Sequence, residues 1–204
     1  AAFPRGTLAG PARYLAGESF FQVGEFAAAL PLFEQVIQDD VKEYLDRSLY
    51  RAGECASSLN NWPAGQKHYE QLIQKFPNFK QLNDAKYGLA FALQKQNQFD
   101  KAIGLYEDVA EQSTGESGAK SRYMLGEIAF AKKDYDDAVF HYGAVVSGFG
   151  YPHWQGMALF EMARCLVELE KKPQAIAAFE RIQKEFPDHE KADDAQRLLA
   201  ELKK

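Results

Sequence analysis

The sequence has few cysteines and no long apolar run. Its 204 residues include only Cys55 and Cys165, which are too few for a disulfide framework and have no histidine at metal-ligand spacing. No stretch approaches the roughly 20 apolar residues that a membrane-spanning helix needs. These absences exclude a disulfide-stapled scaffold, and we expect no membrane insertion.

Basic residues are also in short supply. The chain has 24 Lys and Arg against 29 Asp and Glu, for a net charge of -5. Because nucleic acids are bound mainly through clustered lysines and arginines, we expect no nucleic-acid partner. The four histidines are scattered, and the sequence contains no nucleophile–base pair, glycine-rich phosphate loop or metal quartet. We therefore expect a protein that is not an enzyme and needs no cofactor or metal.

What the sequence does contain is a repeat of 36 or 37 residues. Small residues recur at this spacing, and each is followed four positions later by an aromatic ring. The first small column and its rings are Ala29, Gly65, Ala102, Ala138 and Ala175, with Phe33, Tyr69, Tyr106, Tyr142 and Phe179. Two further sets of equivalent small residues, which we also call small columns, come before the first one in each repeat. One set is Gly17, Gly53, Ala90, Gly126 and Ala163. The other set is Ala12, Ser48, Ala85, Ser121 and Ala158. The spacing predicts two helices per repeat, in which small residues let backbones approach and rings fill the space beside them.

Signals for helix starts fall at the same place in several repeats. Pro63 and Pro173 occupy equivalent positions in the first turn of a second helix, where the missing amide donor costs nothing. The aspartates of "KKDYDDA", residues 132 to 138, stand at another such start, where carboxylates offset the helix dipole. These signals support the division of each repeat into two helices.

This pattern of small, aromatic and proline columns resembles the tetratricopeptide repeat (TPR). The resemblance implies an all-α fold, a right-handed superhelix or α-solenoid of five helix-turn-helix repeats plus a C-terminal capping helix. We place an N-terminal tail at residues 1–10 and the cap at 189–204. The repeats are placed at about 11–45, 46–82, 83–118, 119–155 and 156–188.

The resemblance also implies a binding surface, because the first helices of TPR proteins line a concave groove. The predicted groove residues are Tyr14, Glu18, Tyr50, Glu54, Tyr87, Phe91, Tyr123, Glu127, Phe160 and Arg164. The rings suit an extended segment or a helix of a partner, since they bury area at little entropic cost. The alternative is that they only pack on neighbouring helices. The carboxylates would receive Lys or Arg from a basic partner, or else are solvated surface acids.

The sequence thus predicts a non-catalytic scaffold or adaptor that binds a peptide or helix of a protein partner. Two alternatives stay open: a self-assembling structural module that forms a homo-oligomer, and a docking domain of a larger protein.

The "YMLGE" run at residues 123 to 127 and the "FP" joints at 76 and 186 are similar to those of bacterial cell-envelope TPR adaptors. Examples are the periplasmic coordinator of the Tol-Pal system and the lipoprotein of outer-membrane assembly. This similarity favours a periplasmic or cell-envelope location over a cytoplasmic one. The chain has no N-terminal Cys for lipidation, which speaks against a mature lipoprotein unless the chain was trimmed, and it begins without Met, so we expect a processed form or a segment.

Overall fold

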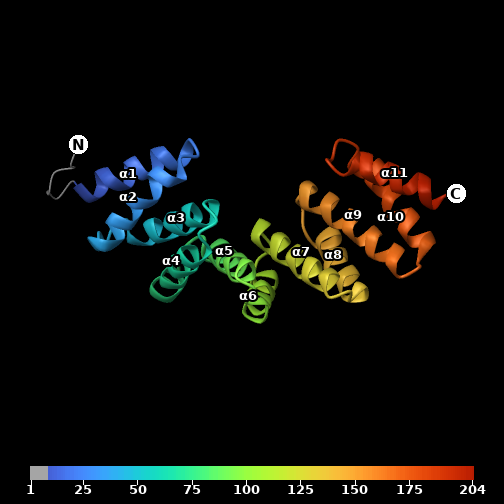
Figure 1. Cartoon of the computed structure of the whole chain (residues 1–204), viewed down its shortest axis with the longest axis horizontal. Coiled ribbons are helices and arrows are strands. Elements are labelled where there is room, and N and C mark those ends of the chain that lie inside the picture. The colour runs from blue at the N-terminus through green and yellow to red at the C-terminus, as the bar shows by residue number, and fades with distance from the viewer. Residues whose placement is uncertain (1–8) are drawn as a thin grey trace. The chain divides into compact units, whose positions relative to one another are not determined.

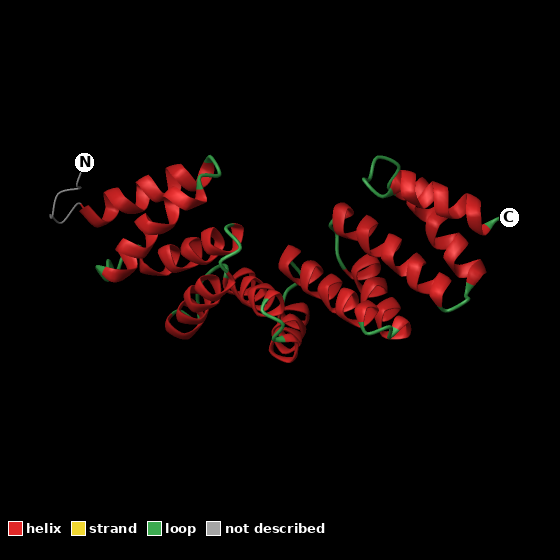
Figure 2. Ribbon diagram, in the orientation of Figure 1, coloured by secondary structure: helices red, strands yellow, loops and turns green. Residues whose placement is uncertain are grey.

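The computed structural model describes residues 9–204, and these residues form α-helices joined by short turns, with no strand among them (Figures 1 and 2). The helices are α1 (Ala9–Gln22), α2 (Phe26–Gln38), α3 (Leu45–Ser58), α4 (Trp62–Lys75), α5 (Leu82–Lys95), α6 (Phe99–Gln112), α7 (Glu116–Ala131), α8 (Tyr135–Gly148), α9 (Pro152–Glu168), α10 (Lys172–Glu185) and α11 (Ala192–Leu202). The chain divides into two compact units, Ala1–Leu105 and Tyr106–Lys204, with the division inside α6. Each unit is described below by itself.

Helices pack in chain order within each unit. In the first unit α1 packs on α2, α2 on α3, α3 on α4 and α4 on α5. In the second unit the same order runs from α7 to α11. Helices two apart also touch, since α3 contacts α5 and α7 contacts α9. This sequential packing is that of a TPR solenoid, so the predicted all-α repeat fold is confirmed.

The small residues that recur in the repeats leave space for buried aromatic rings on the neighbouring helix. Tyr69 of α4 lies against Gly53 of α3 and Gly88 of α5, and a Cβ atom on either glycine would stand 2.6 or 2.5 Å from the ring. Tyr142 of α8 lies in the same way against Gly126 of α7, at 2.6 Å. Contacts this short leave no room for a methyl group. The rings can reach these positions only because the facing residues are small.

The ends of the repeat array differ from its interior. Ser48, Ala85, Ser121 and Ala158 have no exposed surface, whereas Ala12, which holds the same column in α1, is exposed. The difference has a simple cause, since no helix among residues 9–204 precedes α1. At the other end, Ala195 of α11 is fully buried while Arg197 and Ala200 are exposed, as expected of a capping helix. The tail and repeat boundaries drawn from the sequence stay predictions, and residues 1–8 of that tail lie outside the described part.

The turn between the two helices of every repeat has the same backbone conformation. One residue in each turn has a positive φ, and these residues are Gly24, Asn60, Asn97, Lys133 and Glu170. The following amide then donates to a carbonyl five residues back, as from Asn61 to Ala56 at 2.8 Å and from Asp134 to Ala129 at 2.9 Å. This Schellman arrangement closes each first helix. The side chain of Asp134 then accepts from the amide of Asp137 at 3.2 Å and begins α8, which confirms the predicted helix start.

Glycine should stabilise the two turns in which a long side chain holds the left-handed conformation. Lys133 and Glu170 have φ values of 62° and 57°, where an L side chain costs roughly 1–2 kcal/mol and glycine does not. We expect Lys133→Gly and Glu170→Gly each to raise the free energy of unfolding by about 1 kcal/mol in urea denaturation. Lys132→Gly is the control, because Lys132 has a φ of -79° and should lose stability. If glycine at position 133 lowered the free energy of unfolding as much as glycine at position 132, the left-handed backbone conformation of Lys133 would be contradicted.

Candidate partner-binding site

The predicted groove residues fall into two sets, one in each unit. In the first unit, α1 carries Tyr14 and Glu18, α3 carries Tyr50 and Glu54, and α5 carries Tyr87 and Phe91. In the second unit, α7 carries Tyr123 and Glu127, and α9 carries Phe160 and Arg164. Each pair is four residues apart, which places both members on one face of its helix.

Three of the six predicted rings are buried against neighbouring side chains. Tyr14 stacks on Tyr44 with ring centroids 4.6 Å apart. Tyr123 lies 5.4 Å from both Tyr142 and Trp154. Phe160, with 6% of its surface exposed, is packed edge-on against Phe179 at 5.9 Å. These three rings contribute to packing in the structure and offer a partner little area.

The other three rings, those of Tyr50, Tyr87 and Phe91, keep more exposed surface. Tyr50 and Tyr87 are half-buried. Tyr50 lies 5.5 Å from Phe79, and Tyr87 stacks at 6.3 Å on Phe91, which is itself half-buried. Lys95 lies over the Phe91 ring at 5.0 Å. Half-buried rings with fixed neighbours present a rigid apolar surface, which is the kind that anchors a partner.

The carboxylates of the first unit are already paired within the chain. Arg51 of α3 donates from Nε to Glu18 at 2.7 Å and from Nη1 to Glu54 at 2.8 Å, and its guanidinium lies 4.4 Å from the Phe21 ring centre. Burial raises the pKa of Glu54, and Arg51 partly offsets the rise. Arg51 therefore engages both Glu18 and Glu54 within the chain, and a contact of these carboxylates with a basic partner stays a prediction.

The acids of the second unit have other partners. Glu127 accepts a hydrogen bond from the hydroxyl of Tyr142. Glu161, which is buried, accepts from Arg164 at 2.7 Å, and burial raises the pKa of Glu161. Arg164 also lies over the Phe130 ring at 5.0 Å. Predicted residues Glu127 and Arg164 thus both take part in internal contacts.

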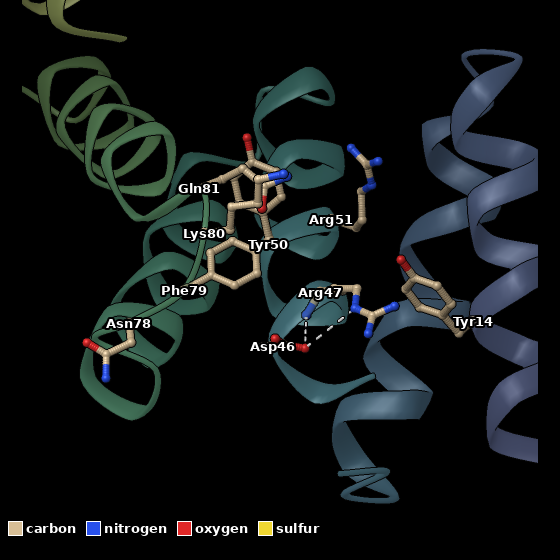
Figure 3. A pocket seen from close by; sticks show the side chains of 9 residues that line it. All are labelled: Tyr14, Asp46, Arg47, Tyr50, Arg51, Asn78, Phe79, Lys80 and Gln81. Atoms are coloured by element: carbon tan, nitrogen blue, oxygen red, sulfur yellow. Dashed lines mark hydrogen bonds and ion pairs between the residues drawn. The ribbon is translucent and has the colours of Figure 1, made fainter. Parts of the chain in front are cut away.

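A pocket in the first unit brings two predicted residues together with others that the repeat pattern did not identify. It has a volume of about 340 Å³ and lies between α1, α3 and the α4–α5 turn (Figure 3). In Figure 3 the side chains of Arg47 and Arg51 lie between Tyr14 on one side and Tyr50 and Phe79 on the other. The full lining is Tyr14, Asp46, Arg47, Tyr50, Arg51, Asn78, Phe79, Lys80 and Gln81.

This pocket combines an apolar surface with hydrogen-bond donors. Tyr50 and Phe79 supply the rings, and Arg47 and Lys80 supply charged groups that are exposed to solvent. Pockets that bind a partner's side chains have this composition, with aromatic walls and a few polar groups that fix orientation. A second hollow of about 260 Å³ adjoins it and shares Asp46, Asn78 and Phe79. We take the two hollows as the candidate site of the first unit.

Nothing in residues 9–204 assembles a metal site or a membrane span. No group of three or more His, Cys, Asp or Glu in this range is placed to hold a metal ion. Burial raises the pKa of Cys55 and of Cys165 to about 12, so neither thiol is a nucleophile at neutral pH. None of the described helices is long and apolar enough to cross a bilayer.

Two imidazoles, that of His68, which is buried, and that of His141, which is largely covered, make stability depend on pH. His68 lies 3.2 Å from Glu34 and His141 lies 3.5 Å from Asp137, and the Nδ1 atom of each has no hydrogen-bond partner among the described residues. Burial lowers the pKa of both rings below the ordinary value of 6.5. The unfolded chain therefore binds protons more readily, so stability is full above pH 6.5 and falls as the pH drops below it.

We expect His68→Leu and His141→Leu to remove this dependence. Leucine holds the same column at Leu32 and Leu105, so it fits the repeat. Each change should raise the free energy of unfolding by about 1 kcal/mol at pH 5.5, because no buried ring must stay uncharged and no buried nitrogen lacks a partner. Urea denaturation at pH 5.5 and 7.5 measures the gain. An equal gain at both pH values would show that protonation has no part in it.

Comparisons with known proteins agree with this architecture. The family model of YfiO, outer membrane lipoprotein, matches residues 42–204, which leaves α1 and α2 outside the match. The solved structure of MamA protein is 15% identical with a TM-score of 0.72, over 88% of this chain and 92% of that one. YrrB, a TPR protein with an unusual peptide-binding site, is 17% identical with a TM-score of 0.65, over 91% and 90%.

A third solved structure and the curated proteins complete the comparison. The C-terminal part of a TPR repeat-containing protein from Cytophaga hutchinsonii is 16% identical with a TM-score of 0.72, over 85% of this chain and 65% of that one. At these identities the structures show a common TPR fold. A search of curated proteins gave no significant match. Proteins of the matched family and fold are typically non-catalytic. Since the family model covers most of its length, the chain belongs to the YfiO family of outer membrane lipoproteins, built on a TPR fold.

Proposed function

We propose that this chain is a non-catalytic adaptor that binds a segment of a partner protein on the first-helix face of its first unit. The observation that carries the proposal is the pocket that joins Tyr14 of α1, Tyr50 of α3 and Phe79 of the α4–α5 turn. The rings of Tyr50 and Phe79, which come from separate elements, meet there beside exposed cations, and TPR folds serve protein interaction. The half-buried Tyr87 and Phe91 of α5 provide further apolar area in the same unit.

Site-specific photo-crosslinking tests this assignment. A photo-crosslinking amino acid placed at Lys80, which is exposed in the pocket wall, should capture a partner protein in cells that make the full-length protein. The same amino acid at Lys67, which is exposed on the second helix α4, is the matched control and should capture much less. Equal capture at both positions, or none at Lys80, would count against a partner at this pocket.

Self-assembly is the second candidate, and one observation favours it. Leu15 of α1 is 60% exposed and Val23 of the α1–α2 turn is 70% exposed, whereas the equivalent positions Arg51 and Leu59 are more covered. Exposed apolar side chains of this kind are suited to contact with a second copy. Sedimentation at increasing concentration would show association in the wild type that Leu15→Glu abolishes. A monomer at all concentrations would remove this candidate.

A further inference from the structure

Cations gather around Phe79 in a chain that is acidic overall. The two adjoining hollows that share Phe79 are lined by Arg47, Arg51, Lys75 and Lys80, against the single acid Asp46. The whole chain carries a net charge of -5. The lining of this site therefore has the opposite sign to the molecule as a whole.

Three of these cations are available to a partner. Arg51 is occupied by Glu18 and Glu54. Lys75 and Lys80 are exposed and have no ion pair among residues 9–204, and Arg47 has 54% of its side chain exposed. Asp46 offsets part of the charge of Arg47, since its carboxylate stands 4.0 Å from the Arg47 guanidinium and also accepts the Arg47 backbone amide at 2.7 Å, but it forms no ion pair with Lys75 or Lys80. The unsatisfied charge of the site is positive.

The apolar part of the site lies between these cations. Phe79 is half-buried and lines both hollows, and Tyr50 lies beside it with ring centroids 5.5 Å apart. Lys75 and Lys80 flank Phe79 in sequence, and Arg47 approaches from α3. An occupant that matches this arrangement has an apolar side chain for the rings and carboxylates on both sides of it.

From this complementarity we propose that the partner segment bound by the first unit is acidic. It would place an apolar residue on Phe79 and Tyr50 and its Asp or Glu residues near Arg47, Lys75 and Lys80. The proposal rests on the function proposed above and names the chemistry of its partner. It differs from the basic partner that the sequence left open as one reading of Glu18, Glu54 and Glu127, because Arg51 already occupies the first two of these carboxylates.

A panel of labelled peptides tests the sign of the partner's charge. Ten-residue fluorescein-labelled peptides would share a Phe-Leu core and differ only in flanks of Glu, Gln or Lys. Fluorescence anisotropy should show the Glu peptide binding the full-length protein at least tenfold more tightly than the Gln peptide. Its affinity should fall when salt is raised from 50 to 300 mM, since exposed charges are screened. Equal affinity for all three peptides, or preference for the Lys peptide, would overturn the proposal.

Charge reversal locates the binding. Arg47→Glu with Lys80→Glu should abolish the preference for the Glu peptide. Lys67→Glu with Lys101→Glu changes the net charge equally on the second helices α4 and α6 and should leave the preference intact. Unchanged thermal unfolding would show that each variant is folded. Loss of preference in both double variants would mean that overall charge, and not this site, attracts the peptide.

The outcome can be separated from that of the crosslinking experiment. Capture of a partner at Lys80 together with no preference for acidic peptides would overturn the charge assignment alone. Absence of capture at Lys80 would instead remove the proposed function on which it rests.

Discussion

Replacing Gly53 with alanine should lower the free energy of unfolding by about 1–2 kcal/mol, although alanine is the better helix former. A Cβ atom at this position would stand 2.6 Å from the ring of Tyr69. That ring cannot move away, because it is 3% exposed and lies 2.5 Å from the Cβ position of Gly88 on its other side. Overpacking of a rigid core typically costs 1–3 kcal/mol, which exceeds the gain in helix propensity of roughly 1 kcal/mol.

Gly104→Ala is the matched control for this prediction. Gly104 lies inside α6, is exposed, and has no atom within 4 Å of its Cβ position among the described residues. Alanine there should raise the free energy of unfolding by about 0.5–1 kcal/mol, because only the backbone preference changes. Urea denaturation of both variants should show a loss of unfolding free energy for Gly53→Ala and a gain for Gly104→Ala. If Gly53→Ala were stabilised, the packing of the Tyr69 ring would not require a glycine at position 53.

Replacing Arg51 with methionine should lower the free energy of unfolding by about 2 kcal/mol at pH 7. The change leaves Glu18 and Glu54 close together without a cation, and their side chains are only 22% and 28% exposed. Removing one partner from a buried ion pair costs roughly 3–5 kcal/mol, and we expect less here because water reaches the site. Urea denaturation at pH 7 measures the loss.

The loss should shrink as the pH falls toward 5. Without Arg51 the folded-state pKa of Glu54 would rise further, so the folded protein would bind protons more readily than the unfolded chain and gain stability on acidification. A combined Glu18→Gln and Glu54→Gln background should remove this pH dependence and leave only the lost packing on Phe21. A loss of the same size at every pH would mean that Arg51 acts through packing alone. Arg47→Met, at an exposed position on α3, should change stability by less than about 0.5 kcal/mol.

The fold could be predicted because the repeat columns record a packing geometry that recurs. Each ring needs a small residue opposite it, and this requirement is written into the sequence at a fixed spacing. Reading the repeat columns alone did not predict every close contact of the rings. Gly88 belongs to none of the small columns, yet it also lies against the ring of Tyr69 because α5 approaches α4 there.

The site was harder to predict because it depends on residues that do not recur. Tyr14 and Tyr50 were found through their column, but Arg47, Phe79 and Lys80 lie at positions whose chemistry varies between repeats, since Asp84, Lys120 and Met157 hold the position of Arg47. The position of Arg51 is held in the other repeats by Leu15, Gly88, Met124 and Glu161. Because the residues at this repeat position share no property, the sequence did not predict that Arg51 pairs with Glu18 and Glu54. Only the structure shows this pairing.

The packing of Tyr69 between α3 and α5 also affects how the first unit unfolds locally. One side chain of α4 fits between the backbones of α3 and α5, which belong to successive repeats. Withdrawing either neighbour would leave the ring beside a void and expose it to water. Helices α3, α4 and α5 therefore open as a single cooperative block, and a hairpin at this point cannot fray without its neighbour.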